Sequence, residues 1–271
     1  MENVVIVIPI YKLILSKQEE ASLRQCFTIL GRYDICFVTH NNLKTSYYKS
    51  IISQYNINVS FAYFPEEWFS GIAGYNRLCM GRELYETFEQ YEYMLIYQPD
   101  AWVFRDELKE WCAKGYDYIG APWSKPEVFH GTPIWVGNGG LSLRRVKAFI
   151  RPFRNSNKKI FSAATLYQDV NWHKPRTIVT FLLKLAGYKN NFKSLHSYFE
   201  QFGTAEDMFW CCALSNTCFR LKIPAKEEAR MFAFEMNPHK EFEQNSNILP
   251  FGCHAFMKYS FKDFWSRYIK I

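Results

Sequence analysis

The first hundred residues alternate between short apolar runs and longer mixed stretches. Residues 4–11 form a nearly continuous run rich in Val and Ile, which is typical of a strand buried on both faces of a parallel sheet. The pattern predicts further strands and intervening helices, with strands at 34–40, 59–64 and 93–97 and helices at 19–30, 46–54 and 74–91. This β-α-β-α-β-α-β order predicts an α/β protein with a doubly wound sheet.

The regular alternation ends near residue 104. Further elements are expected, namely a helix, a short strand, a strand–turn–strand unit and a second helix, at 106–114, 117–123, 135–143 and 206–213. Residues 177–185 are apolar on one side and lie among Lys and Arg residues. They fit either an amphipathic surface helix that touches lipid or a core helix, and we favour the core helix.

The length and composition suit one domain, expected over residues 1–271. Aromatic residues make up 18% of the chain. Such an excess often lines sugar-binding or flat-ligand sites, and it also occurs in ordinary aromatic cores. The eight cysteines include no CxxC pair, so a structural zinc site is not expected. Several lie in apolar runs, as buried reduced thiols do, which indicates a reducing compartment.

The chain termini and charge pattern point to an intracellular protein with an anionic partner. The N-terminus has no basic segment before its short apolar run, and no apolar run reaches the ~20 residues of a membrane-spanning helix. We therefore expect a soluble, cytoplasmic protein. The net charge is +7, and residues 128–168 contain seven Lys and Arg but no acidic residue. This block favours a nucleotide diphosphate, a phospholipid surface or nucleic acid, unless it is simply a solvated face.

Several common catalytic motifs are missing from the sequence. It has no P-loop, no GxGxxG after the first strand, no GxSxG and no HExxH. The first of four remaining clusters is Gln98-Pro99-Asp100, which directly follows a predicted strand. A carboxylate at that end of a strand can hold a divalent cation that bridges nucleotide phosphates, although Pro-Asp is also ordinary turn chemistry.

The second cluster is Gly137-Asn138-Gly139-Gly140, flanked by Trp123 and Trp135. Asn-Gly is a strong signal for a hairpin turn, and a glycine-rich backbone also lets a sugar approach closely where side chains would clash. The two interpretations are compatible.

The third and fourth clusters lie in the last quarter of the chain. Thr204-Ala-Glu-Asp207 has the spacing of a helix capping box, and one of its two carboxylates could instead be a general base over a cleft. His254 ends the loop Pro-Phe-Gly-Cys-His, where it could bind a metal or a phosphate or be structural.

These clusters, in this order, resemble a GT-A glycosyltransferase. The segments Gly120-Ala-Pro-Trp123 and Gly137-Asn-Gly-Gly-Leu-Ser-Leu-Arg144, with Glu206-Asp207 and Pro250-Phe-Gly-Cys-His-Ala-Phe256, resemble a bacterial glycosyltransferase-like family formerly of unknown function. The resemblance implies a GT-A-like, Rossmann-like mixed sheet, mostly parallel and flanked by helices. It also implies a nucleotide-binding half at about 1–104 and an acceptor-binding half at about 105–271. One departure is clear: Gln98 stands where the first acid of the family's Asp-x-Asp motif would be, which weakens the case for metal dependence.

The resemblance also implies roles for individual residues. A nucleotide-sugar donor, expected to be a UDP-sugar, would contact Pro9, Tyr11, Thr39, His40, Arg77, Gln98 and Asp100. Asp100 and His254 would hold Mn²⁺ or Mg²⁺. Asp207, or Glu206, would be the base of an inverting transfer. The sugar and acceptor contacts would come from Trp123, Trp135, Gly137, Asn138, Gly139 and Gly140.

The sequence therefore predicts a hexosyltransferase-type glycosyltransferase of bacterial polysaccharide synthesis. Its acceptor would be a saccharide or a saccharide on a lipid diphosphate, with possible peripheral contact at the inner face of the membrane. One alternative is an inactive sugar- or nucleotide-binding module, which Gln98 favours. Another is a nucleotidyltransferase, which the absence of glycine after the first strand disfavours. No nucleic-acid-binding motif is recognised, so no nucleic-acid partner is expected.

Overall fold

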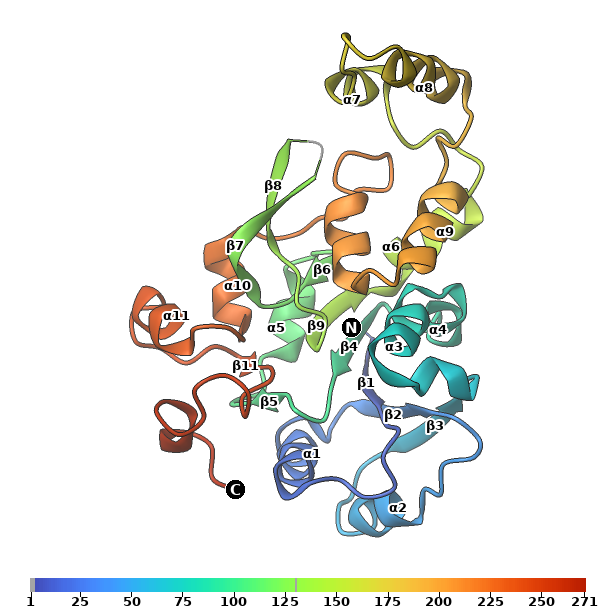
Figure 1. Ribbon diagram of the computed structural model, residues 1–271. Coiled ribbons are helices and arrows are strands. Elements are labelled where there is room, and N and C mark those ends of the chain that lie inside the picture. Colours follow the sequence, from blue (N-terminus) through green and yellow to red (C-terminus); the bar gives the residue numbers. More distant parts are fainter. Residues whose placement is uncertain (1–2, 130) are drawn as a thin grey trace.

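A six-stranded mixed sheet lies at the centre of the fold (Figure 1). Its order is β3 (Val59–Tyr63), β2 (Asp34–Thr39), β1 (Val4–Pro9), β4 (Tyr93–Tyr97), β9 (Leu141–Arg145) and β6 (Tyr118–Ile119). The first four strands are parallel, and β9 is antiparallel to both of its neighbours. The predicted α/β class, with a mostly parallel sheet flanked by helices, is confirmed. Strands from before and after residue 104 share this sheet.

The computed structural model describes residues 3–129 and 131–271. Met1 and Glu2, which entered the argument about a leader, lie outside the described residues. Within them, the helices are all too short or too polar to cross a bilayer. Seven of the eight cysteines are buried free thiols, and Cys218 is exposed.

Strand β1 shows why the sheet is buried on both faces. Val5 and Val7 pack into one hydrophobic core, and Ile6 and Ile8 pack into another on the opposite face, because successive side chains of a strand alternate. The first core is covered by α3 (Gly71–Met80), α4 (Arg82–Thr87), α6 (Val146–Arg154) and α9 (Phe192–Phe202). The second is covered by α1 (Lys17–Leu30), α2 (Ser46–Ile52) and α5 (Leu108–Ala113).

The single helix predicted at 74–91 is wrong, because the chain forms α3 and α4 with a break at Gly81. Gly81 has an extended backbone (φ −70°, ψ 142°). The break frees the carbonyl of Cys79, which accepts hydrogen bonds from the Tyr85 hydroxyl at 2.6 Å and from Trp210 Nε1 at 2.9 Å. Side chains from other segments thus satisfy the end of α3, as helix ends require.

A small three-stranded sheet lies beside the end of β4. It contains β10 (Ala233–Phe234), β11 (Gly252–Cys253) and β5 (Trp102–Val103), and it adjoins α10 (Lys226–Phe232), α11 (Pro238–Gln244) and the short helix Trp265–Arg267. Cys253 pairs with Trp102. This pairing brings the residue after β11 close to the residues that precede β5.

Two more units complete the chain. Strands β7 (Pro122–Phe129) and β8 (Thr132–Val136) form an antiparallel pair. Helices α7 (Ala163–Gln168) and α8 (Pro175–Ala186) form a helical hairpin that projects from the rest of the fold (Figure 1). The favoured prediction that residues 177–185 form a core helix is wrong, because no residue of α8 is buried. Phe181 and Leu185 pack against the first core only as half-buried side chains, so α8 lies at the edge of that core.

Candidate functional site

The chain changes direction in the sheet between β1 and β4. From β1 it continues to β2 and β3 on one side, and it then crosses back to β4 on the other side. Open α/β sheets bind ligands at such a switch point, outside the carboxyl ends of the strands. A cavity of about 500 Å³ lies there. Its walls are rich in aromatic side chains, which come from Tyr11, Trp68, Phe69 and Tyr75.

Four of the seven predicted donor contacts line this cavity, namely Pro9, Tyr11, Gln98 and Asp100. Thr39 does not line it, because its side chain is fully buried at the end of β2, and its ligand contact stays a prediction. His40 also lies outside the lining residues, and its ring packs against Phe69 at a centroid distance of 5.5 Å. His40 can therefore support the cavity wall but does not form it.

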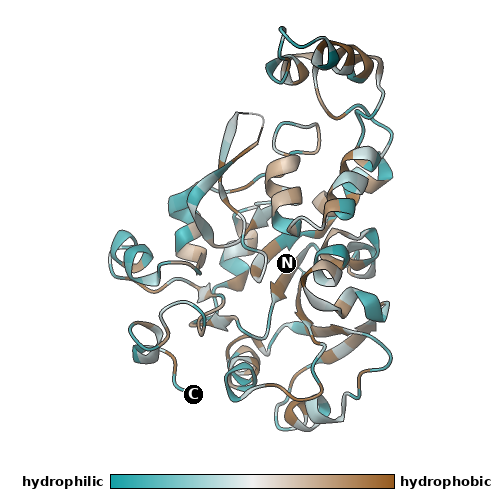
Figure 2. Cartoon of the chain, viewed as in Figure 1, coloured by the Kyte–Doolittle hydropathy of each residue, from teal (hydrophilic) through white to brown (hydrophobic). Residues whose placement is uncertain are grey.

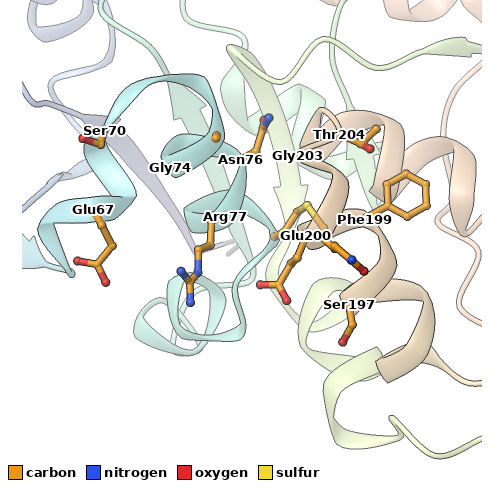
Figure 3. A pocket seen from close by; sticks show the side chains of 13 residues that line it. Glu67, Ser70, Gly74, Asn76, Arg77, Ser197, Phe199, Glu200, Gly203 and Thr204 are labelled. Atoms are coloured by element: carbon orange, nitrogen blue, oxygen red, sulfur yellow. The ribbon is translucent and has the colours of Figure 1, made fainter.

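Arg77 faces a different cavity. Along α3, Ile72 and Tyr75 line the 500 Å³ cavity, whereas Asn76 and Arg77 line a second one of about 560 Å³ between α3 and α9. Figure 3 shows the Arg77 side chain on that side, across from Glu200. Helical geometry directs Arg77 and Ile72 to different faces, so the cavity places Arg77 away from the expected pyrophosphate, and its contact stays a prediction.

Other groups supply positive charge at the switch-point cavity. The first residues of α3, Gly71 and Ile72, line it, and Ser70 makes no side-chain cap there. Uncapped N–H groups at the positive end of a helix attract anions. Lys12 and Glu19 both line the cavity, with Lys12 Nζ 2.6 Å from Glu19 Oε1, so the carboxylate offsets part of the ammonium charge. The hydrogen bond to Glu19 raises the pKa of Lys12. Lys12 is absent from the sequence predictions, although it follows β1 by only three residues.

Gln98 and Asp100 line one part of the switch-point cavity, and His254 contacts both of them. Its Nε2 is 2.9 Å from Gln98 Oε1 and 3.2 Å from Asp100 Oδ1, and its Nδ1 is 3.1 Å from Glu235 Oε2. Burial lowers the pKa of His254, but hydrogen bonds and charge from Asp100 and Glu235 outweigh it and raise the pKa to about 10. Burial likewise raises the pKa of Asp100, and His254 more than reverses this, so the pKa is lowered.

Glu235 was missed by the sequence analysis. It directly follows β10, in the run Met-Phe-Ala-Phe-Glu, so a carboxylate after a short apolar run was the available signal. It contacts His254 and, through its charge, also raises the pKa of Asp207. The charge of Glu235 thus acts both on His254 and on Asp207, the candidate base.

Of the two candidate bases, only Asp207 is free to act. Glu206 is 3% exposed, and both of its oxygens accept hydrogen bonds from the guanidinium of Arg144, at 2.6 and 3.0 Å. This buried ion pair leaves Glu206 in a structural role, so we discard it as a base. Asp207 is half-buried and accepts from the backbone N–H of Asn138 at 3.1 Å and of Met208 at 2.8 Å. Burial raises its pKa, as suits a general base.

The loop 137–140 holds these groups in place. Asn138 has a positive φ of 54° and donates its N–H to Asp207. A Cβ on Gly139 would lie 2.0 Å from Glu206 Oε1, and one on Gly140 would lie 2.1 Å from His254 Nε2. The glycines are required because the protein's own site side chains occupy that space. The hairpin interpretation is wrong, since β8 and β9 on either side belong to different sheets.

The two tryptophans beside this loop differ in their surroundings. A Cβ on Gly137 would fall 1.8 Å from Trp123 Cζ2, so the half-buried Trp123 ring packs directly on the loop backbone. Trp135 is 37% exposed, with Lys226 Nζ 4.3 Å from its ring centroid. Neither ring lines the switch-point cavity; whether they contact a sugar remains a prediction.

The side chains around His254 could bind a divalent cation only if a bound substrate supplied further metal ligands. Over residues 3–129 and 131–271, no cluster of three or more His, Cys, Asp or Glu has the arrangement of a metal site. Asp100 offers one carboxylate, with the weaker amide oxygen of Gln98 beside it. His254 offers an imidazole only after it loses the proton that its raised pKa favours. Mg²⁺ commonly binds through one or two carboxylates together with substrate phosphates. The residues present therefore suit a cation that arrives with a nucleotide.

Comparisons with solved structures give distant likenesses. Mouse xyloside xylosyltransferase 1 in its apo form shares 9% identity, with 93% of this chain and 97% of that chain covered and a TM-score of 0.45. Core-mannan synthase A of Aspergillus fumigatus in its Mn/GDP form shares 10% identity over 77% and 72%, with a TM-score of 0.41. The 4-diphosphocytidyl-2C-methyl-D-erythritol synthase of Anaerococcus prevotii shares 12% identity over 68% and 96%, with a TM-score of 0.36. Sequence identities and TM-scores this low support no conclusion about what this chain binds.

Sequence comparison places the chain in a family. No curated protein matches it in sequence. A family model described as "Protein of unknown function (DUF5672)" matches residues 58–254, a range that contains all four clusters identified from the sequence. Because this match spans well over half of the chain, the protein belongs to the DUF5672 family.

Proposed function

We propose that this protein is a glycosyltransferase that moves a sugar from a nucleotide-sugar donor to a hydroxyl group of an acceptor. The arrangement of Asp100, His254 and Asp207 carries the proposal. Asp100 and His254 come from distant segments and meet beside an aromatic cavity at the switch point of the sheet. Glu235, which contacts His254, also acts through its charge on Asp207. The geometry combines a place for a flat base, a place for an anionic leaving group and a carboxylate with a raised pKa.

The donor would lie along the switch-point cavity. A nucleobase fits among the aromatic side chains near Tyr11 and Trp68, because flat rings stack on aromatic faces. The diphosphate would lie toward Lys12 and the N-terminus of α3, where ammonium and backbone N–H groups are available. The sugar would then point toward Asp100 and His254.

Asp207 would remove the proton from the acceptor hydroxyl as that oxygen attacks the anomeric carbon. The N–H groups of Asn138 and Met208 hold the carboxylate in one orientation. A single base of this kind gives displacement with inversion, in which the bond to the diphosphate breaks as the bond to the acceptor oxygen forms. Glu206 and Arg144 would act only as support beneath it.

Asp100 and His254 would hold a divalent cation, with the phosphates of the donor as its other ligands. When bound, such a cation supplies positive charge opposite the leaving diphosphate. Lys12 and the N-terminus of α3 offset part of the same charge without it.

Finer features of the function are also proposals. We take the donor to be a UDP-sugar, the transferred group to be a hexose and the acceptor to be a saccharide, free or lipid-linked, in polysaccharide synthesis. The half up to about residue 104 would hold the donor, and the later half would hold the acceptor. A reducing, cytoplasmic location agrees with seven buried free thiols.

The test is a thermal-shift panel with UDP, GDP, CMP and dTDP, each with Mn²⁺ and with EDTA. A nucleotide at a hundred times its Kd should stabilise the fold by about 2.7 kcal/mol, or roughly 5–10 °C for a chain of this size. A shift that Asp100→Asn reduces would support the donor site, and its loss in EDTA would support the cation. No shift with any nucleotide would contradict the proposal.

Activity assays separate the remaining alternatives. Slow hydrolysis of the matching nucleotide-sugar, with release of the nucleoside diphosphate, is expected from a glycosyltransferase without its acceptor. Binding without hydrolysis or transfer would indicate an inactive binding module. Pyrophosphate release from a nucleoside triphosphate and a sugar phosphate would indicate a nucleotidyltransferase instead.

A further inference from the structure

The α7–α8 hairpin carries an apolar stripe that nothing in the fold covers. Val179, Leu182 and Leu183 are 55%, 57% and 46% exposed, and with Ala186 they have the i, i+3, i+4, i+7 spacing of one helix face. The inward stripe is separate, since Phe181 packs against Tyr167 and Trp172 of the same hairpin. Helix α8 therefore has two apolar faces, and only one of them has a partner.

Positive charge surrounds the uncovered stripe. No acidic residue occurs between Asp169 and Glu200. Lys174, Arg176 and Lys189 lie exposed within this interval. Two exposed aromatic residues, Trp172 and Tyr188, lie just before and just after α8. A short helix with an apolar face, basic flanks and aromatic residues at its ends has the features of a segment that lies in the membrane interface.

The position of the hairpin allows such contact. Figure 1 shows α7 and α8 projecting away from the sheet, and Figure 2 shows hydrophobic residues along α8 within this projection. The helix can thus reach a flat surface before the rest of the fold does. It is far too short to span a bilayer.

We propose that the outer face of α8 docks the protein on a membrane surface that contains anionic lipids. The apolar stripe would enter the boundary between headgroups and acyl chains, and the basic residues would contact the lipid phosphates. A second copy of this chain is a poorer occupant, because two hairpins that each carry basic residues and no acid between Asp169 and Glu200 repel each other. This inference does not depend on the proposed catalytic activity.

The experiment is flotation of the purified protein with vesicles of phosphatidylcholine alone or with a quarter phosphatidylglycerol. We expect binding to the anionic vesicles that weakens in high salt. The triple variant Val179→Ser, Leu182→Ser, Leu183→Ser should bind about a hundredfold more weakly or worse. Lys174→Gln with Arg176→Gln should bind roughly 25-fold more weakly, at about fivefold for each basic residue.

Control variants carry substitutions of the same kind elsewhere on the surface. Ile248→Ser removes another exposed apolar side chain, and Lys109→Gln with Lys240→Gln removes two exposed charges on α5 and α11. These variants should bind as the wild type does, and all variants should keep the wild-type unfolding temperature. No binding of the wild type to anionic vesicles, or equal loss in the control variants, would overturn the proposal. A dimer that the triple variant abolishes, without vesicle binding, would assign the face to a second copy instead.

Discussion

The switch-point site and the α7–α8 hairpin differ in how their residues are held. At the site, Glu206 is 3% exposed and bound to Arg144, and the backbone of Gly139 and Gly140 passes so close to Glu206 and His254 that a methyl group would not fit. On α8, no residue is buried. In the first region, chemistry and stability depend on the same contacts, so a substitution changes both. In the second, surface properties can change while the fold stays intact.

The largest effect is expected from Asp207→Asn. Loss of the proposed base should reduce sugar transfer by about 10²–10⁴-fold, while the affinity for the nucleotide stays near the wild-type value because Asp207 does not line the donor cavity. Steady-state transfer rates and nucleotide titrations measure the two quantities. Transfer at the wild-type rate would remove Asp207 from the mechanism.

Breaking the buried ion pair should cause the next largest change. Arg144→Met leaves the Glu206 carboxylate buried without its partner, and it should lower the free energy of unfolding by about 3–5 kcal/mol. Removing both charges, as Arg144→Met with Glu206→Leu, should restore much of that loss. Arg82→Met, which breaks an exposed pair with Glu86, should cost under about 1 kcal/mol. Denaturant titration of the four proteins tests this order.

Gly140→Ala should lower the free energy of unfolding by about 1–3 kcal/mol, since the new methyl group would overlap the His254 ring. Combining it with His254→Ala provides the control. In a background without the ring, Gly140→Ala should cost clearly less. An equal cost in both backgrounds would show that the backbone, and not the ring, makes glycine necessary.

The pH dependence of transfer should reflect the environment of Asp207. Burial raises the pKa of this carboxyl above its ordinary value, and a base must be ionised to act. Activity should therefore be present above the raised pKa and should fall about tenfold per pH unit below it. The measurement is kcat/KM against pH, and the residual activity of Asp207→Asn should lack this acid limb. A limb at the ordinary Asp value of about 3.9 would contradict the assignment.

The smallest effect on stability is expected on the hairpin. Leu182→Ser should change the free energy of unfolding by less than about 0.5 kcal/mol, because its side chain is already exposed. Phe181→Ala, on the inward face against Tyr167 and Trp172, should cost more. Equal effects of the two substitutions would indicate that the outer face is covered in solution.

The sequence pattern predicted the first half of the fold well, because the strands and helices of that half follow from local periodicity. The apolar run of β1 identified a doubly buried strand because both of its faces meet a core. The split of the 74–91 helix was missed because the Tyr85 and Trp210 side chains that satisfy its broken end come from beyond α3 itself. The exposure of α8 was missed because an amphipathic pattern does not reveal whether another element covers the helix.

The site shows the same division. The sequence by itself determined which residue types could carry chemistry: Asp100 after a strand, Asp207 before a helix, and His254 in a loop. Only the tertiary structure decided that His254 contacts Asp100 and that Glu206 forms an ion pair with Arg144. It also decided that Arg77 and Asp100 line different cavities. The reason is physical. Local patterns record what each segment can form, whereas the partner of a charged side chain depends on strand pairing and helix rotation between segments distant along the chain.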